Sequence, residues 1–327
     1  MKLLVTGGAG YIGAVTVRRL REAGHSPVVL DDLSEGHRAA VGDTELVVGD
    51  FGDSARVGEL VRSKSIDGVV HFAASSLVGE SVQDPARYYR NNLVRSLMLL
   101  DVLREQGVGR FVLSSTAAVY GEPLTIPMDE DHPTRPTNPY GETKLALEGA
   151  LRWYQAAYGF GSISLRYFNA AGATQDGVLG EVHDPETHLI PNVLRAALTS
   201  EPVPVFGRDY ATHDGTAVRD YVHVEDLADA HVLALERLEK QGGAEVFNLG
   251  NGAGFSVLQV IDAARRVTGR TIPIRQAPRR PGDPDGLVAS SARAREVLGW
   301  KPRHADLDAI LETAWRFARA HPRGYAS

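Results

Sequence analysis

The stretch KLLVTGGAGYIG, residues 2–13, decides the fold of the first half of the chain. It opens with an apolar strand, and a helix-like stretch, Ala14–Ala23, follows the glycines. Gly7 permits a tight turn between strand and helix, Gly10 lets the backbone approach a pyrophosphate, and Gly13 allows the helix to pack closely. Because a helix N-terminus also offers aligned N–H groups to an anion, the pattern predicts a dinucleotide-binding turn.

A second apolar run, Pro27–Leu30, ends at Asp31. This is close to the spacing at which an acidic side chain accepts hydrogen bonds from the ribose of an adenosine. A carboxylate at this position also repels a 2′-phosphate, so the sequence favours NAD over NADP as the cofactor. The less specific interpretation is a structural glycine turn followed by a solvated aspartate.

Composition and charge exclude several classes of protein. The chain has 327 residues, of which 43% are hydrophobic, so it can hold one large or two ordinary domains. Its 35 basic and 41 acidic residues give a net charge of −6 without long charged runs, so we expect no nucleic-acid partner and no membrane partner. The absence of cysteine excludes disulfides, thiolate metal sites and a cysteine nucleophile. No apolar run reaches the ~18 residues of a membrane span, and the chain begins directly with a strand, so we expect a cytoplasmic protein.

Apolar, β-branched runs alternate with amphipathic stretches over the first half of the chain. This alternation predicts an α/β fold, a doubly wound parallel sheet with helices on both faces. We expect residues 1–170 to form a Rossmann domain, a strand near residues 244–250 to return to its sheet, and residues 171–327 to form a smaller mixed domain. Ligands lie outside the carboxyl ends of parallel strands, so the site is expected between the two lobes. Strands are predicted at Glu45–Val48, Asp67–Phe72, Arg110–Ser114, Ser162–Arg166 and Val246–Leu249, and helices at Ala55–Lys64 and Tyr88–Gln106.

A tyrosine and a lysine four residues apart lie at the start of a predicted helix. Asn138–Pro139 suits the first positions of that helix, which places Tyr140 and Lys144 on one face. An ammonium near a phenol favours the phenolate, so we expect the pKa of Tyr140 to fall from about 10 toward the range of a general base. The alternative is an ordinary surface pair. Ser114–Thr116, at the end of an apolar strand, offers a hydroxyl at the same edge and favours the catalytic interpretation.

Recognisable segments occur in order along nearly the whole chain. They resemble those of the extended short-chain dehydrogenase/reductase superfamily and, within it, of nucleotide-sugar epimerases. The segments are GGAGYIG at Gly7, HFAA at His71, VGESV at Val78, YYRNN at Tyr88, SSTAAVYGEP at Ser114, PTNPYG at Pro136, SLRYFNAAGA at Ser164, FGRDY at Phe206, DGTAVRDYVHVEDLADAH at Asp214, FNLGNG at Phe247 and RRPGD at Arg279.

The resemblance implies roles for individual residues. Tyr140 would be the acid/base, Lys144 would orient the nicotinamide ribose and tune Tyr140, and Thr116 would hydrogen-bond the sugar hydroxyl. Many relatives carry serine at this last position, and threonine keeps the hydroxyl. Ser76 stands where relatives often carry a lysine near the pyrophosphate, which weakens one cofactor contact. NAD contacts are implied at Gly7, Gly10, Tyr11, Ile12, Gly13, Asp31, Asp32, Leu33, Asp50, Phe51, Phe72, Ala73, Ala74, Asn91, Ser114, Tyr140, Lys144 and Tyr167.

The resemblance also implies a UDP-hexose substrate. Arginines suit its diphosphate because a guanidinium fork matches phosphate oxygens. Two simpler interpretations stay open: Arg219 could pair with Asp220 or Asp226, and Phe206 could be part of the core. The implied contacts are Thr116 and Tyr140 with the hexose, Asn169 with the sugar-phosphate, Arg219 and Arg280 with the diphosphate, Asp283 with the uridine ribose, Leu189 and Phe206 with the uracil, and Leu287 as a gate for N-acetylated sugars.

The activity that the resemblance implies is the interconversion of UDP-galactose and UDP-glucose. C4 of the hexose would be oxidised transiently to a 4-keto sugar, and hydride would return to the opposite face. Alternatives are epimerisation of N-acetylated UDP-hexoses, epimerisation or decarboxylation of UDP-glucuronate, and a non-catalytic NAD-binding sensor. A 4,6-dehydratase is disfavoured because Ala117–Ala118 stands where dehydratases carry an acid/base pair. In relatives, the helices matching Tyr88–Gln106 and Pro139–Tyr158 pair between two subunits, so a homodimer is expected.

The histidines do not suggest a metal site at this level. His183, Asp184, His188 and His213 lie within one part of the chain, but their spacing matches no standard ligand pattern. We therefore expect solvated or loop-anchoring histidines and no metal.

Overall fold

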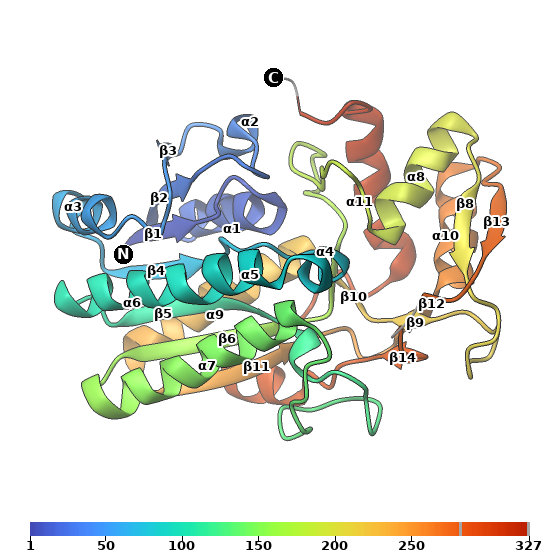
Figure 1. Ribbon diagram of the computed structural model, residues 1–327. Coiled ribbons are helices and arrows are strands. Elements are labelled where there is room, and N and C mark those ends of the chain that lie inside the picture. The colour runs from blue at the N-terminus through green and yellow to red at the C-terminus, as the bar shows by residue number, and fades with distance from the viewer. Residues whose placement is uncertain (281–282, 326–327) are drawn as a thin grey trace.

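The computed structural model describes residues 1–280 and 283–325. Its larger lobe is built on a seven-stranded sheet in which all neighbouring strands are parallel (Figure 1), and this confirms the predicted α/β class. The strand order is β11 (Ala244–Leu249), β6 (Gly161–Tyr167), β5 (Arg110–Thr116), β4 (Gly68–His71), β1 (Lys2–Thr6), β2 (Ser26–Asp31) and β3 (Glu45–Val48).

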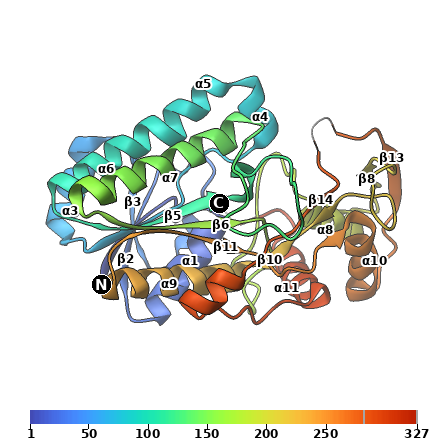
Figure 2. The same ribbon diagram turned by 90° about the horizontal axis from the view of Figure 1, so that it is seen from below.

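Helical segments cover both faces of this sheet. They are α1 (Tyr11–Glu22), α2 (Arg38–Val41), α3 (Ser54–Lys64), α4 (Val78–Gln83), α5 (Pro85–Tyr88), η1 (Tyr89–Val94), α6 (Arg95–Glu105), η2 (Ala117–Val119), α7 (Pro139–Tyr158), α9 (Val224–Lys240) and η3 (Ala294–Leu298). In Figure 2, α3, α6 and α7 lie on one face, and α1 and α9 lie on the other. The sheet is therefore the middle layer of three.

Successive side chains of β1 pack on opposite faces of the sheet. Leu3 and Val5 belong to the core shared with α1 and α9, whereas Leu4 belongs to the core shared with α3, α6 and α7. Side chains of a strand alternate between the faces of its sheet, so a strand covered on both faces is apolar throughout. All three side chains are fully buried.

The smaller lobe packs three helices and several short strands around a core of its own, which includes Ile190, Val205 and Ile261. Its elements are β7 (Asn169–Ala171), α8 (Leu189–Thr199), β8 (Val203–Phe206), β9 (Val218–Arg219), β10 (Tyr221–His223), β12 (Phe255–Ser256), α10 (Val257–Thr268), β13 (Ile274–Ala277), β14 (Gly286–Leu287) and α11 (Leu307–Ala320). β7 pairs with β10, β8 with β13, and β9 with both β12 and β14.

The sheet lobe takes elements from both halves of the sequence. β11 pairs with β6 at one edge of the sheet, and α9 packs along α1. The strand predicted near residues 244–250 is this β11. The division at residue 170 stays a prediction. Both α9 and β11 follow that residue in the sequence but pack with the larger lobe.

Two helical segments begin earlier than the sequence predicted. α1 begins at Tyr11, directly after Gly10, and the helical stretch predicted from Tyr88 begins at Pro85. The second start has a local cause, since the carboxylate of Asp84 accepts a hydrogen bond from the backbone N–H of Arg87 at 3.1 Å. In the described part of the chain, no helix is both long enough and apolar enough to cross a bilayer.

Candidate active site

The glycine turn between β1 and α1 leaves room for an anion. Gly7 has φ of +72°, and a Cβ there would lie 2.5 Å from the backbone N of Ala73. A Cβ at Gly13 would overlap the carbonyl oxygen of Gly7, whereas one at Gly10 would meet only that oxygen, at 3.5 Å. No side chain caps α1, and its first turn has no acidic residue. Its first N–H groups are thus free for a pyrophosphate, so the turn fits a dinucleotide.

Asp31 is fixed at the carboxyl end of β2, beside this turn. Its carboxylate accepts hydrogen bonds from the backbone N–H of Ala9 and of Leu33, each at 2.9 Å. Burial raises the pKa of Asp31, and the two backbone hydrogen bonds oppose that shift. Each oxygen keeps further acceptor capacity, so the group can still receive ribose hydroxyls. The next residue, Asp32, accepts from the N–H and hydroxyl of Ser34.

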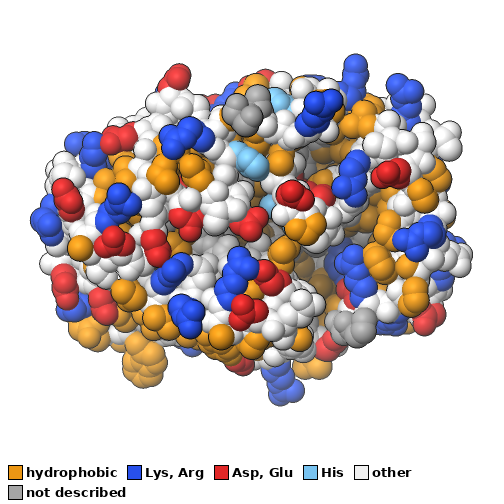
Figure 3. All heavy atoms as spheres, turned by 45° about the horizontal axis from the view of Figure 1, so that its top comes forward, with side chains coloured by type: hydrophobic (Ala, Val, Ile, Leu, Met, Phe, Trp, Pro, Cys, Tyr) orange, Lys and Arg blue, Asp and Glu red, His pale blue; other side chains and the backbone are white. Residues whose placement is uncertain are grey.

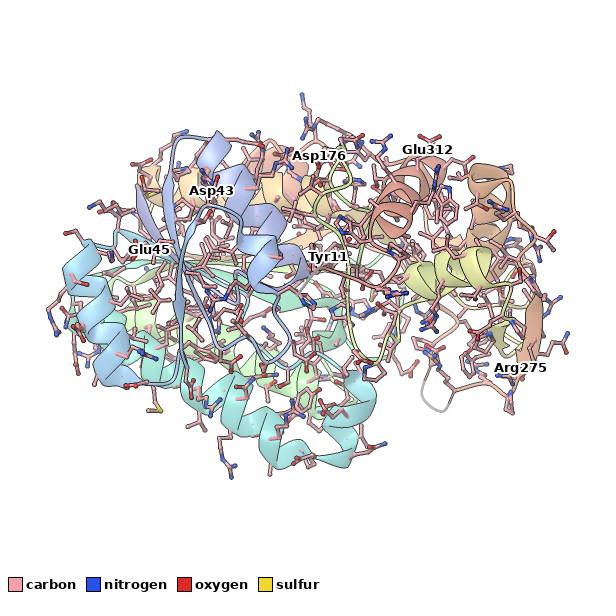
Figure 4. All side chains as sticks on the ribbon, turned by 90° about the horizontal axis from the view of Figure 1, so that it is seen from above. Tyr11, Asp43, Glu45, Asp176, Arg275 and Glu312 are labelled. Atoms are coloured by element: carbon pink, nitrogen blue, oxygen red, sulfur yellow. The ribbon has the colours of Figure 1, made fainter. Side chains whose placement is uncertain are left out.

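The other predicted cofactor contacts follow the neighbouring strands. Asp50 accepts from the backbone N–H of Gly52 at 2.8 Å and pairs with Arg95 at 3.1 Å. Asn91 donates to the hydroxyl of Ser75 at 3.2 Å. The rest lie on α1, on the loop after β2, and at or just beyond the ends of β3 and β4; they are Tyr11, Ile12, Leu33, Phe51, Phe72, Ala73 and Ala74. Figure 4 shows Tyr11 at the end of α1 that faces the smaller lobe.

Tyr140 is brought to the end of β5 by the way α7 begins. Asn138 caps α7 through a hydrogen bond from the backbone N–H of Gly141 at 2.9 Å. A Cβ at Gly141 would overlap the carbonyl oxygen of Ala118, so only glycine lets this first turn approach the segment after β5. Thr116, the last residue of β5, is buried there, and its hydroxyl accepts from the N–H of Ala118 at 3.1 Å. The structure therefore brings Thr116 and Tyr140 together, as predicted.

The electrostatics of this cluster differ from the prediction. Burial raises the pKa of Tyr140, and the nearby Thr116 hydroxyl only partly opposes that rise. Lys144 donates to the backbone carbonyl of Ser114 at 2.7 Å. The prediction that Lys144 lowers the pKa of Tyr140 is wrong for this arrangement, because desolvation of the phenol dominates and the ammonium is directed to Ser114. Burial also lowers the pKa of Lys144 to about 8, although the charge of Glu148 opposes that shift.

Lys144→Met is expected to change the pH dependence of stability. The folded pKa of Lys144, about 8, lies below its ordinary 10.5, so the unfolded chain holds more protons between these values. The stability of the native protein relative to the variant should therefore rise with pH, by about 2 kcal/mol between pH 7 and pH 9.5. Urea unfolding of both proteins at the two pH values measures this difference. The lost hydrogen bond to Ser114 shifts both measurements equally, and parallel pH curves would contradict the prediction.

Ser114 and Tyr167 complete the cluster on the sheet side. The Ser114 hydroxyl and the Tyr167 phenol are hydrogen-bonded across β5 and β6. Burial raises the pKa of Tyr167, so this phenol stays protonated. Both groups thus lie beside the carbonyl that holds Lys144.

A buried polar network beneath α7 escaped the sequence analysis. Glu148 and Arg166 form a salt bridge at 2.5 Å, with side chains only 1% and 5% exposed. Glu148 also accepts from the Ser115 hydroxyl at 2.5 Å, and Arg166 donates to the Tyr120 hydroxyl at 2.9 Å. The network ties α7 to β5 and β6 one turn beyond Lys144. Lys144 and Glu148 are four residues apart and share one helix face, and this spacing is the sequence signal that could have indicated the network.

On the smaller lobe, the predicted substrate residues gather around an ion pair. Arg219 pairs with Asp283, which also accepts from the Tyr210 hydroxyl at 2.9 Å. The alternatives in which Arg219 pairs with Asp220 or Asp226 are therefore wrong. Asp220 instead accepts backbone N–H groups from two other loops.

The remaining predicted substrate residues lie on several elements and loops of the smaller lobe. The guanidinium of Arg280 lies 4.1 Å from the ring centre of Phe206, and Leu287 pairs with Arg219 between β14 and β9. Asn169 donates to the carbonyl of Asp220 at 3.1 Å, and Leu189 is the first residue of α8. Pro281 and Gly282 of the RRPGD motif lie outside the described residues. Figure 3 shows the surface hollowed between the two lobes, with basic side chains at the rim.

Of the histidines considered as ligands, His183 and His188 lie together, whereas His213 lies apart from them. His183 and His188 face Glu181 and Glu186 in the loop before α8. His213 pairs instead with its neighbour Asp214 at 3.6 Å, and Asp184 is not part of the group.

Comparisons with known proteins agree with this geometry. A family model described as the NAD dependent epimerase/dehydratase family matches residues 3–250. A UDP-glucose 4-epimerase from Halalkalibacterium halodurans is 53% identical over 328 residues, covering 100% of this chain and 98% of that protein. The crystal structure of UDP-glucose 4-epimerase from Brucella ovis in complex with NAD is 48% identical, with a TM-score of 0.94 over 97% of this chain and 98% of that one. The enzyme from Bifidobacterium longum, in complex with NAD⁺ and UDP, is 38% identical, with a TM-score of 0.94 over 99% and 100% of the two chains.

Proposed function

Because this chain belongs to the NAD dependent epimerase/dehydratase family, we propose that it interconverts UDP-galactose and UDP-glucose by epimerisation at C4. The observation that carries the proposal is the gathering of Thr116, Tyr140 and Lys144 at the carboxyl edge of the sheet that holds the glycine turn. Ala117–Ala118 follows Thr116, and methyl groups cannot transfer protons as a dehydratase requires. An epimerase is thus favoured over a dehydratase.

The chemistry follows from the acidity of the bonds involved. The C–H bond at a carbinol carbon is not acidic enough to lose a proton directly. A bound NAD⁺ would supply the missing chemistry, a reversible acceptor for the hydride of C4 that allows its return to the opposite face. Tyr140 would exchange a proton with the C4 hydroxyl, while Thr116 would hydrogen-bond that hydroxyl. Because burial raises the pKa of Tyr140, its phenolate form requires a nearby positive charge, which the oxidised cofactor would provide when bound. Lys144 would hold the nicotinamide ribose.

Epimerisation also requires the hexose to turn while the nucleotide stays bound. We assign that anchoring to the smaller lobe. Arg219 and Arg280 would hold the diphosphate, and Asp283 would exchange its pairing with Arg219 for the uridine ribose. Asn169 would contact the sugar-phosphate, and Leu189 and Phe206 would enclose the uracil. A firmly held UDP leaves the hexose free to present its other face.

The direct test is conversion of UDP-galactose to UDP-glucose by purified protein without added NAD. Deuterium placed on C4 should stay on C4, because hydride is transferred and returned within one site. Nuclear magnetic resonance follows both the sugar and the label. A 4-keto-6-deoxy product would support the dehydratase instead, and loss of deuterium to solvent would exclude transient oxidation.

Leu287 is proposed to set the breadth of substrates. Its side chain is intermediate in size, so we expect UDP-glucose and UDP-galactose as main substrates and slower turnover of N-acetylated UDP-hexoses. Leu287→Tyr should lower the rate on UDP-N-acetylglucosamine and Leu287→Ala should raise it, with little change on UDP-glucose. Steady-state rates on both substrates measure this. Equal ratios in the three proteins would remove Leu287 from substrate selection.

A homodimer is proposed through α6 and α7, which lie side by side on one face of the sheet lobe (Figure 2). Apolar side chains are exposed on these helices: Trp153 is 76% exposed, and Met98 and Tyr158 are exposed as well. Large exposed apolar groups on adjacent helices are typical of an interface. Trp153→Glu is expected to shift the protein toward monomer, as measured by light scattering after size exclusion. A native protein that is monomeric at all concentrations would contradict the dimer. A cytoplasmic location stays a prediction of the sequence.

A further inference from the structure

The loop before α8 gathers a set of possible metal ligands. Glu181, His183, Glu186 and His188 each offer one donor atom, and these atoms lie within 4.8 Å of one another. Nδ1 of His183 lies 3.3 Å from Oε1 of Glu181 and 3.5 Å from Oε2 of Glu186. Nδ1 of His188 lies 2.8 Å from Oε1 of Glu181 and 3.2 Å from Oε1 of Glu186. Two imidazoles and two carboxylates thus converge on one point.

These separations match a tetrahedral ion. Zinc binds histidine nitrogen at about 2.0–2.1 Å and carboxylate oxygen at about 2.0–2.2 Å, so the donor atoms of a regular tetrahedron lie about 3.3–3.5 Å apart. The four nitrogen–oxygen distances here range from 2.8 to 3.5 Å. The remaining separations between donor atoms are within 4.8 Å, so the side chains would adjust their positions to bind an ion at the centre.

The charges and hydrogen bonds of the group also favour a cation. The side chains of Glu181 and Glu186 are 8% and 10% exposed, and among the described residues no lysine or arginine lies within ion-pair distance of either. Nδ1 of His183 is buried and forms no regular hydrogen bond within the described part of the chain, although it lies 3.3 Å from Glu181 and 3.5 Å from Glu186. The positive partners of the two carboxylates are the imidazoles of His183 and His188, and a divalent ion would replace the two protons of these rings where their nitrogens meet the carboxylate oxygens.

The backbone of this loop is held from three sides. The Tyr325 hydroxyl bonds both the N–H and the carbonyl of Gly180 at 3.0 Å, and Asn192 of α8 donates to the carbonyls of Glu186 and His188. His37, from the loop after β2, reaches the carbonyl of Val182 at 3.3 Å. The ligand set is therefore presented by an anchored loop at the junction of the two lobes, one residue before Leu189.

A second group, His223, Glu225 and His304, offers a comparison. Both ring nitrogens of His223 already have partners, the backbone N–H of Glu225 at 3.2 Å and the hydroxyl of Thr313 at 3.0 Å. An ion there would break a hydrogen bond and would have fewer ligands. This group is a control and not a second site.

We propose that Glu181, His183, Glu186 and His188 bind one divalent transition-metal ion of the zinc type in a closed, structural site. Four protein ligands leave no open position, so the ion would not take part in the reaction. It would tie the loop to the start of α8 and so fix the position of Leu189. The spacing of the histidines alone does not indicate this site, because two of its four ligands are glutamates.

The test uses full-length protein purified without a metal-affinity column and dialysed against metal-free buffer. Elemental analysis is expected to find about one zinc per chain, or, after chelation, zinc titration is expected to reach about one equivalent and to raise Tm. His183→Gln, His188→Gln and Glu186→Gln should each lose most of the bound zinc, whereas the control His304→Gln should keep it. Circular dichroism verifies that the variants are folded. If a variant does not fold, cobalt(II) titration of the native protein takes the place of that measurement. The visible absorption bands of bound cobalt(II) report whether its nitrogen and oxygen ligands are tetrahedral.

Three results would overturn the proposal. They are native protein that neither contains nor saturably binds zinc, folded ligand variants that retain the native zinc content, and a cobalt spectrum typical of six-coordinate solvated ion. Zinc content is measured apart from UDP-galactose turnover, so failure of the proposed reaction and failure of the metal site are distinguishable.

Discussion

Replacing Tyr140 by Phe is expected to lower kcat by about 10²–10⁴, the usual contribution of a positioned general acid or base. The variant keeps the ring, and with it the packing against the first turn of α7, but loses the only atom that can exchange a proton with the C4 hydroxyl. Thr116 cannot replace it, because its hydroxyl accepts from the N–H of Ala118 and has a far higher pKa. Steady-state conversion of UDP-galactose measures the effect.

Tyr154→Phe is the matched control for this variant. Tyr154 lies on the same helix, and its phenol is hydrogen-bonded to the exposed carboxylate of Asp101 at 2.7 Å, far along α7 from Tyr140. It should leave kcat near the native value. Retained NAD absorbance in both variants would separate lost chemistry from lost cofactor. Native turnover by Tyr140→Phe would remove this residue from the mechanism.

The second large effect concerns stability. Glu148→Leu should lower the free energy of unfolding by about 3–5 kcal/mol, because it leaves the charge of Arg166 buried without its partner. Replacing both residues, in Glu148→Leu with Arg166→Met, should recover most of that loss, since a well-packed apolar pair can match a buried ion pair. Urea unfolding of the single and double variants measures both values.

A surface pair provides the reference for this experiment. Arg266 and Asp308 are bonded at 2.7 Å on exposed parts of α10 and α11, so Arg266→Ala should have little effect on the free energy of unfolding. If Glu148→Leu costs no more than Arg266→Ala, the network beneath α7 does not stabilise the fold. If it costs as predicted, turnover should fall in the single variant and recover in part in the double one, because α7 positions Tyr140.

The sequence predicted the features that depend on local periodicity. Apolar runs identified the parallel strands, and the glycine spacing identified the turn at Gly7. The position of Thr116 followed from a general rule, because the carboxyl ends of parallel strands share one edge, and the helix start at Asn138–Pro139 predicted that Tyr140 and Lys144 share one helix face. These features need no knowledge of which distant residues pair.

The features that the sequence did not predict depend on pairing across the fold. The partner of Arg219 is Asp283, on a different loop, and nearer carboxylates in the sequence were equally plausible. The pKa of Tyr140 depends on how completely the phenol is buried, which spacing alone does not reveal. Glu148 and Arg166 meet only because α7 packs on β5 and β6. Each of these features is determined by a distance between residues far apart in the sequence, or by how deeply a side chain is buried.

The edge position of β11 has a consequence for synthesis on the ribosome. β6 cannot gain its outer neighbour until residues 244–249 have left the exit tunnel, and α1 lacks its covering helix until α9 has been made. A nascent chain that stops after β6 therefore exposes an unpaired strand edge and an uncovered apolar layer. Truncated chains ending near residue 170 are expected to aggregate or engage chaperones, whereas chains extended past residue 250 can close the sheet during translation.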